Sequence, residues 1–243
     1  MRAGRRVTRI VVAREIKNRR VQEIVEKART EGIPVEFEPR GVLDQLTHGD
    51  KHQGIVATVG AMTYRRLENS LSEFSTPGLL VVLDGIEDPH NLGAIIRSSY
   101  AAGVDALVVT ERRSAPLSET VAKTAAGALE YLPIIRVKNI NRSLATIKKA
   151  GFWVLGLDER GSQNYDQIEL ASSTAFVLGG EGKGLRRLTA ERCDSLIRIP
   201  MIGRISSLNV SVAAGIVLFE AAKQRRHIHQ KIFKKYAVGS NGE

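Results

Sequence analysis

The chain has 243 residues, of which 43% are hydrophobic, enough for one large domain or two smaller ones with buried cores. Lys and Arg outnumber Asp and Glu by 36 to 26, and the formal net charge of +10 favours a polyanionic partner such as nucleic acid. We find no apolar run near the roughly 18 residues of a membrane span, no secretory leader and no Cys/His cluster for zinc. We therefore expect a cytoplasmic protein without a bound metal, in which the single cysteine, Cys193, is a buried bystander.

The first 62 residues alternate short strands and helices, which predicts a small α/β domain. The predicted strands are residues 7–13, 33–39 and 54–60, and the predicted helices are residues 14–32 and 41–47. Residues 63–77 have weak periodicity and end in Ser-Thr-Pro-Gly, so we expect a linker there.

A second domain is predicted over residues 78–228, where nearly continuous apolar strands alternate with helices. The predicted strands are residues 79–85, 106–110, 134–139, 152–158, 174–180 and 196–201, and the helices between and after them are 91–103, 117–132, 141–151, 188–194 and 207–226. This pattern is typical of a parallel sheet with helices on both faces, which binds ligands at the carboxyl ends of its strands. Residues 229–243 lose the pattern and are predicted to form a basic tail.

The loop after the first of these strands reads "DGIEDPHNLGAIIRSS". Asn91 is a suitable N-cap for the following helix, and Gly93 lets that helix approach a neighbour closely. Arg97 lies one turn after Gly93 and is read either as a phosphate contact or as half of an ordinary salt bridge. His90 is equally compatible with a turn residue and a catalytic base.

The loop "FVLGGEGKGLRR" has glycines at 179, 180, 182 and 184. It is not a P-loop, because Gly184 follows Lys183 where a Ser or Thr is required, so nucleotide hydrolysis is disfavoured. A backbone with so few side chains suits either the approach of a flat ligand or a tight structural turn, and Glu181 is the acidic group that it presents.

The stretch "GRISSLNVSVAAG" follows the last predicted strand. Ser206 or Ser207 is predicted to cap the next helix, with Asn209 in its first turn, where free N–H groups attract an anion. The residues that follow, 211–215, are mostly small and permit close packing of this helix.

Together, "NLGAIIRSSYAAG", "FVLGGEGKGLRRLT" and "IPMIGRISSLNVSVAAGIVLFEA" resemble the SpoU (TrmH) class of SPOUT RNA methyltransferases, in that family's order, and the resemblance covers residues 79–226. The segment "HQGIVA", residues 52–57, is similar to the end of the ribosomal-protein-like RNA-binding domain of the RlmB-type 23S rRNA guanosine 2′-O-methyltransferases. On this comparison the front domain is expected to lack its usual opening strand and helix.

The resemblance implies a C-terminal trefoil knot, a homodimer whose active sites combine two subunits, and S-adenosylmethionine as the methyl donor, held largely by backbone groups. The cofactor-binding residues implied by the matching positions are Leu178, Gly179, Gly180, Ile199, Met201, Leu208 and Asn209. The catalytic residues so implied are Arg97, Asn91, Glu181, Ser207 and Asn209.

The implied reaction is transfer of a methyl group to a ribose 2′-hydroxyl. The similarity to RlmB-type enzymes favours a guanosine of 23S rRNA as the substrate. The family proposal makes Arg97 the base, but a guanidinium hardly ever deprotonates, so we favour its stabilising the developing alkoxide electrostatically. Alternatives are a tRNA ribose methyltransferase, a resistance-type rRNA methyltransferase, and a non-catalytic RNA-binding assembly factor that keeps the fold.

Overall fold

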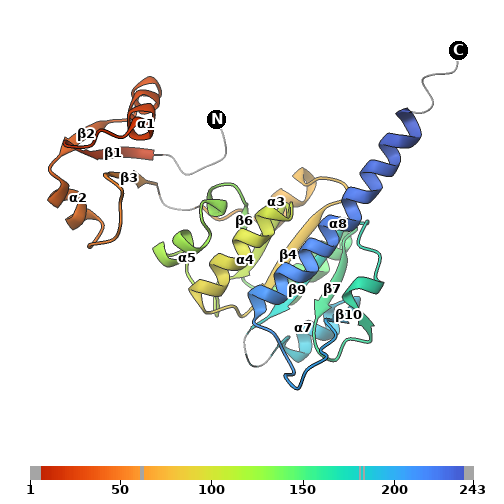
Figure 1. Ribbon diagram of the computed structural model, residues 1–243. Helices are drawn as coiled ribbons and strands as arrows, with labels where there is room; N and C mark the ends of the chain where they lie inside the picture. The colour runs from red at the N-terminus through yellow and green to blue at the C-terminus, as the bar shows by residue number, and fades with distance from the viewer. Residues whose placement is uncertain (1–6, 61–62, 181, 183, 238–243) are drawn as a thin grey trace, which may run out of the picture. The chain divides into compact units, whose positions relative to one another are not determined.

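The computed structural model describes residues 7–60, 63–180, 182 and 184–237, with side chains described as far as Arg226. The chain divides into two compact units, Met1–Met62 and Thr63–Glu243, and each is described by itself (Figure 1).

The first unit is a three-stranded sheet with two helices. Its elements are β1 (Val7–Ala13), α1 (Arg19–Thr30), β2 (Val35–Glu38), α2 (Arg40–Leu46) and β3 (Ile55–Val59). The central strand β1 pairs in parallel with β2 and antiparallel with β3. Because side chains alternate along a strand, Ile10 and Val12 pack against α1 whereas Val11 and Ala13 pack against Leu43 of α2. Alternation along one strand thus builds both small cores.

The second unit is a seven-stranded sheet in which every paired strand is parallel, in the order β6-β5-β4-β9-β7-β10-β8. Its strands are β4 (Leu79–Asp84), β5 (Ala106–Thr110), β6 (Ile134–Val137), β7 (Trp153–Leu157), β8 (Gln163–Asn164), β9 (Thr174–Gly179) and β10 (Ser195–Arg198). Every residue of β4 and β5 is buried, as expected for strands covered on both faces. The predicted parallel α/β sheet is confirmed.

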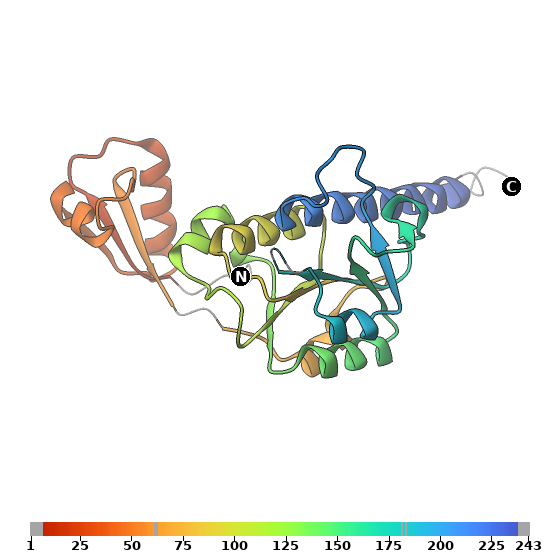
Figure 2. The same cartoon turned by 90° about the horizontal axis from the view of Figure 1, so that it is seen from below.

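Helices cover both faces of this sheet (Figure 2). One layer holds α4 (Pro89–Ala101), α5 (Glu119–Thr124) and α8 (Val210–Ala237), and the other holds α3 (Leu67–Ser70), α6 (Ile140–Lys149) and α7 (Arg187–Arg192). Short 3-10 turns lie at η1 (Leu71–Glu73), η2 (Ala128–Glu130) and η3 (Tyr165–Gln167). A Cβ on Gly93 would come within 2.6 Å of Thr124 Cβ, so this glycine permits the close packing of α4 on α5.

Several elements differ from the sequence prediction, and β8 was not predicted at all. The helix predicted over 117–132 is broken into α5 and η2, because Ala126 and Gly127 adopt positive φ angles of 48° and 87°. The segment predicted as a linker contains α3 and η1, and Leu67 of α3 belongs to the main core. The backbone of α8 stays helical as far as Ala237, beyond the point where its apolar periodicity ends.

Candidate active site

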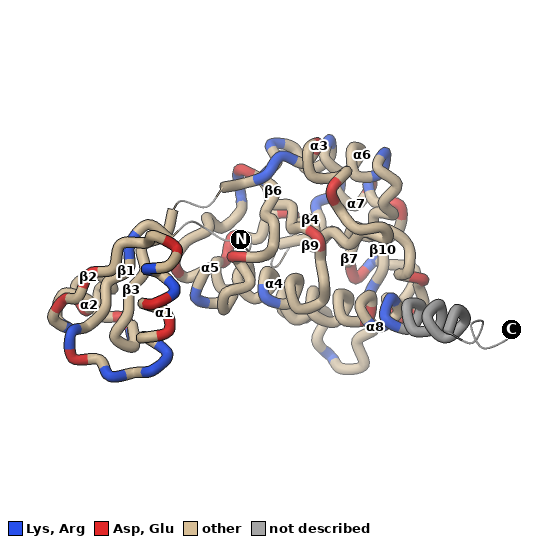
Figure 3. The backbone as a smooth tube through the Cα atoms, turned by 90° about the horizontal axis from the view of Figure 1, so that it is seen from above, with Lys and Arg blue, Asp and Glu red and all other residues tan. Residues whose placement is uncertain are grey.

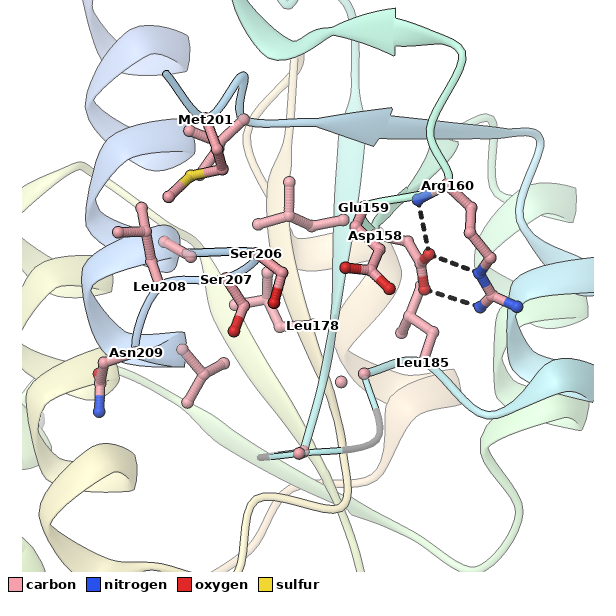
Figure 4. A pocket seen from close by; sticks show the side chains of 18 residues that line it. Asp158, Glu159, Arg160, Leu178, Leu185, Met201, Ser206, Ser207, Leu208 and Asn209 are labelled. Atoms are coloured by element: carbon pink, nitrogen blue, oxygen red, sulfur yellow. Dashed lines mark hydrogen bonds and ion pairs between the residues drawn. The ribbon is translucent and has the colours of Figure 1, made fainter. Parts of the chain in front are cut away.

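A cavity of about 730 Å³ opens where the carboxyl ends of β7, β9 and β10 meet (Figure 4). Its volume lies in the range of pockets that enclose small organic ligands. The residues expected to bind the cofactor all line it: Leu178, Gly179, Gly180, Ile199, Met201, Leu208 and Asn209. Ser206 and Ser207 line it as well. Three segments far apart in sequence therefore contribute to one site, as the position rule for parallel sheets predicts.

The glycine loop after β9 folds back on itself. Gly180 and Gly184 form an isolated antiparallel bridge, in which the Gly184 N–H donates to the Gly180 carbonyl at 3.1 Å. A Cβ on Gly179 would collide with the Gly184 backbone, and one on Gly180 with the Gly85 carbonyl. The loop is thus a tight turn that also lines the cavity. Glu181, predicted as a catalytic residue, lies outside the described residues.

An ion pair anchors the end of this loop to the sheet. Arg186 donates from Nε to Asp84 Oδ1 at 2.7 Å, and its Nη2 bonds the same oxygen. The Asp84 carboxyl is buried at the end of β4, directly beside Gly179 in the strand register. Arg186 therefore ties the glycine loop to the strand that leads into α4.

The loop after β7 contributes three charged residues to the cavity lining, Asp158, Glu159 and Arg160, which the sequence interpretation missed. Arg160 bonds the Asp158 carboxylate at both oxygens, from Nε at 2.7 Å and from Nη2 at 2.8 Å. This hydrogen bonding holds the pKa of Asp158 below its usual value, although burial opposes the shift. Glu159, between them, points its carboxylate into the cavity (Figure 4). The available signal was the position of "LDERG" immediately after a buried strand of the sheet.

Asn209 joins the cavity to α4. Its Oδ1 accepts hydrogen bonds from the Ser211 backbone N–H at 2.9 Å and from Ser211 Oγ at 2.6 Å. Its Nδ2 then faces Asn91 and donates to Asn91 Oδ1 at 2.9 Å. The prediction that Ser206 or Ser207 caps this helix is wrong, because α8 begins at Val210 and Asn209 is the cap.

The start of α4 also differs from the prediction. Asp88 is the N-cap, since its carboxylate accepts from the His90 N–H at 2.9 Å, and Pro89 occupies the first turn. Asn91, expected as the cap, lies inside the helix and is buried, and its side-chain oxygen accepts the hydrogen bond from Asn209. Arg97 is exposed and is not among the residues that line the cavity.

Among the described residues we find neither an activated thiol nor a cluster of metal-binding side chains. Burial raises the pKa of Cys193 to about 12, so its thiolate is scarce at neutral pH. No group of three or more His, Cys, Asp or Glu side chains gathers at a metal-binding distance within the described part of the chain. Among the same residues, we find no helix with the length and apolarity that a membrane crossing requires.

Comparison with known families identifies the second unit. Residues 78–219 match the model of the SpoU rRNA Methylase family. The chain belongs to this family. Residues 1–65 match the model described as RNA 2'-O ribose methyltransferase substrate binding.

Individual SpoU relatives extend the match over nearly the whole chain. The chain is 44% identical to the 23S rRNA (guanosine-2'-O-)-methyltransferase RlmB of Vibrio parahaemolyticus, covering 89% of this chain and 90% of that protein. It is similar to the SpoU methyltransferase AviRb of Streptomyces viridochromogenes in complex with AdoMet, with a TM-score of 0.79, 26% identity, and coverage of 93% and 85%. For the AdoMet-bound rRNA methyltransferase of Sinorhizobium meliloti the TM-score is 0.77, with 29% identity and coverage of 93% and 82%.

Proposed function

We propose that this protein transfers a methyl group from S-adenosylmethionine to the ribose 2′-hydroxyl of a guanosine in 23S rRNA. One observation carries the proposal: the cavity at the carboxyl edge is lined by segments of the two SpoU motif regions that follow β9 and β10, and Asn209 links it to Asn91 of the remaining motif. The 44% identity to an RlmB over 90% of that protein supports the choice of RNA and nucleoside.

The cavity fits S-adenosylmethionine. Leu178, Ile199, Met201 and Leu208 provide apolar surface for a flat adenine ring. The glycine loop presents backbone without side chains, which suits the backbone-held cofactor that the family resemblance implies. When bound, this cofactor supplies an electrophilic methyl group on its sulfonium.

The polar residues act on the ribose. Asn209 has its amide orientation fixed by Ser211 and Asn91, so it is preorganised to hold a hydroxyl in line with the methyl group. Ser207 lines the cavity next to it. We assign Arg97 the stabilisation of the developing alkoxide, because a guanidinium stays protonated and attracts negative charge. Glu181 completes the polar set at a position outside the described residues.

A homodimer accounts for the position of Arg97. This arginine is exposed and does not line the cavity of its own subunit, so it is available to complete the partner subunit's cavity. Large apolar side chains are exposed near the cavity and along α8, including Ile202, Ile205, Val212 and Phe219. Such a surface is typical of a protein interface.

The two family matches, over residues 1–65 and 78–219, support assigning RNA binding to residues 1–62 and methyl transfer to residues 78–228. Residues 63–77, which include α3 and η1, are assigned as the connection, and residues 229–243 as a basic tail whose backbone is helical as far as Ala237. The trefoil knot, formed as residues 199–209 pass between β10 and α8, belongs to this proposal, as does a cytoplasmic location, where ribosomal RNA is found.

Methyl transfer with labelled S-adenosylmethionine tests the proposal. Purified protein is incubated separately with bulk tRNA, 16S rRNA and 23S rRNA, and the labelled nucleotide is mapped. We expect a 2′-O-methylguanosine in 23S rRNA. Label in tRNA or at an adenosine would establish the alternative methyltransferases, and binding of RNA without any label would favour a non-catalytic assembly factor.

A further inference from the structure

The loop that follows β5, residues 111–115, carries two adjacent arginines outside the SpoU motifs. Arg112 and Arg113 are both exposed, and within the described part of the chain neither has a carboxylate at ion-pair distance. Lys and Arg are spread along the backbone of both units, so charge alone singles out no RNA surface (Figure 3). The placement and anchoring of this loop distinguish it.

The strand register places the loop at the edge of the sheet that holds the cavity. Asp84 at the end of β4 is level with Gly179, which lines the cavity. On the other side, Val82 pairs with Val108, so β5 ends two residues later at Thr110, level with Asp84. Thr110 and Gly179 are therefore two strand spacings apart, roughly 10 Å.

Buried contacts fix the loop at both ends. Thr110 Oγ1 donates to the Arg112 carbonyl at 2.6 Å, and the Ala115 N–H donates to the Ile86 carbonyl at 2.8 Å. Thr110, Ala115 and Ile86 are all buried. Ile86 belongs to the loop that leads into α4 and Asn91. The two arginines are thus held beside the first motif.

Arg113 has a φ of 58°, in the left-handed region that non-glycine residues rarely adopt. A long side chain held there by its surroundings is a feature that clusters at functional sites. Glycine would meet the backbone requirement without strain, so the arginine is not explained by the turn.

We propose that Arg112 and Arg113 bind the phosphate backbone of the substrate RNA beside the target ribose. The inference rests on the proposed function, which supplies RNA as the substrate. Guanidinium groups bind phosphate in a bidentate manner, and contacts of this kind position a nucleic acid without reading its sequence. Glu87 and Glu111 are the exposed carboxylates of the same two loops and would repel a phosphate, so Arg112 and Arg113 are the charged groups of these loops that would attract it.

The test compares the double variant R112A/R113A with the control K149A/R192A in the full chain. Lys149 and Arg192 are exposed at the ends of α6 and α7, at the opposite edge of the sheet, and the control also removes two charges. Binding of transcribed 23S rRNA is measured against salt concentration. We expect R112A/R113A to bind about tenfold more weakly and to lower the salt slope by about 2, while the control stays near the parent. Both variants should keep the parent's S-adenosylmethionine affinity.

Two single variants separate charge from backbone. Arg113→Lys should keep the salt slope, whereas Arg113→Gly should lower it without loss of thermal stability. Equal RNA affinity and slope for R112A/R113A and the control would overturn the inference, as would a changed sedimentation coefficient with unchanged RNA binding, which would place the loop in a protein interface. A parent that binds RNA without transferring label would contradict the proposed function alone, because the binding comparison still decides the role of the arginines.

Discussion

At the scale of single residues, the side-chain amide of Asn209 has two structural roles at once. One side chain caps α8 through its oxygen and reaches Asn91 through its nitrogen, so the cap fixes which atom faces the site. The sequence indicated that Asn209 mattered, but its role as cap depends on where α8 begins. Serine and asparagine are equally good caps, so local sequence did not choose between Ser206, Ser207 and Asn209.

Substitution of Asn209 should separate these two roles. N209A removes the cap and is expected to lower the free energy of unfolding by about 1 kcal/mol. It should also lower methyl transfer by at least about tenfold, or about 1.4 kcal/mol of activation free energy. N209D keeps an acceptor for Ser211 but loses the donor to Asn91, so it should be nearer the parent in stability and as poor as N209A in activity.

Asn139 provides the matched control for this pair. It caps α6 by accepting from the Arg142 N–H at 3.1 Å, away from the cavity lining. N139A should show a similar loss of stability in thermal unfolding and retain methyl transfer. Equal losses of activity in N139A and N209A would show that the Asn209 effect comes from stability alone.

At the scale of elements, the apolar strands were predictable and the connections were less so. β4, β5 and β9 are apolar on both faces. In a chain that alternates strands with helices, this pattern predicts a parallel sheet covered by helices on both faces. The break between α5 and η2 was missed, because Ala126 is a good helix former yet adopts a positive φ, and Gly127, which also does, was read as part of the helix. The Asp158–Arg160 pair was missed because it belongs to the site only through the cavity that the segments after β9 and β10 complete.

The loop after β7 gives a prediction about pH. The folded-state pKa of Asp158 is lowered from 3.8 by Arg160, so its stabilising effect is complete above the unfolded value and is lost as pH falls through the folded value. D158N should therefore have a lower melting temperature than the parent at pH 7. The difference should shrink progressively below about pH 4.

The neighbouring variant E159Q serves as the control for this measurement. Glu159 is exposed and lies in the same loop, so E159Q should follow the parent's melting temperature from pH 7 down to pH 3. A gap between D158N and the parent that stays constant over this range would show that the Asp158 carboxylate does not act through its ionised form.

At the scale of the whole molecule, the chain has two units with distinct matches, one to an RNA substrate-binding model and one to the SpoU methylase model. Sequence motifs identified the family because they are short, ordered and chemically specific. They did not show that Arg97 is exposed and lies outside the cavity lining, because that depends on how α4 packs in the folded unit.

The most direct test is the affinity for S-adenosylmethionine of the parent, L208D and L188D, measured by titration calorimetry. Leu208 lines the cavity, whereas Leu188 is 49% exposed on α7 and does not line it. A carboxylate at position 208 would have to be desolvated against the cofactor, so the account predicts at least tenfold weaker binding for L208D, equivalent to about 1.4 kcal/mol. L188D should bind S-adenosylmethionine as tightly as the parent does. A parent that does not bind S-adenosylmethionine, or an L208D variant that binds it as tightly as L188D, would contradict the assignment of this cavity as the cofactor site.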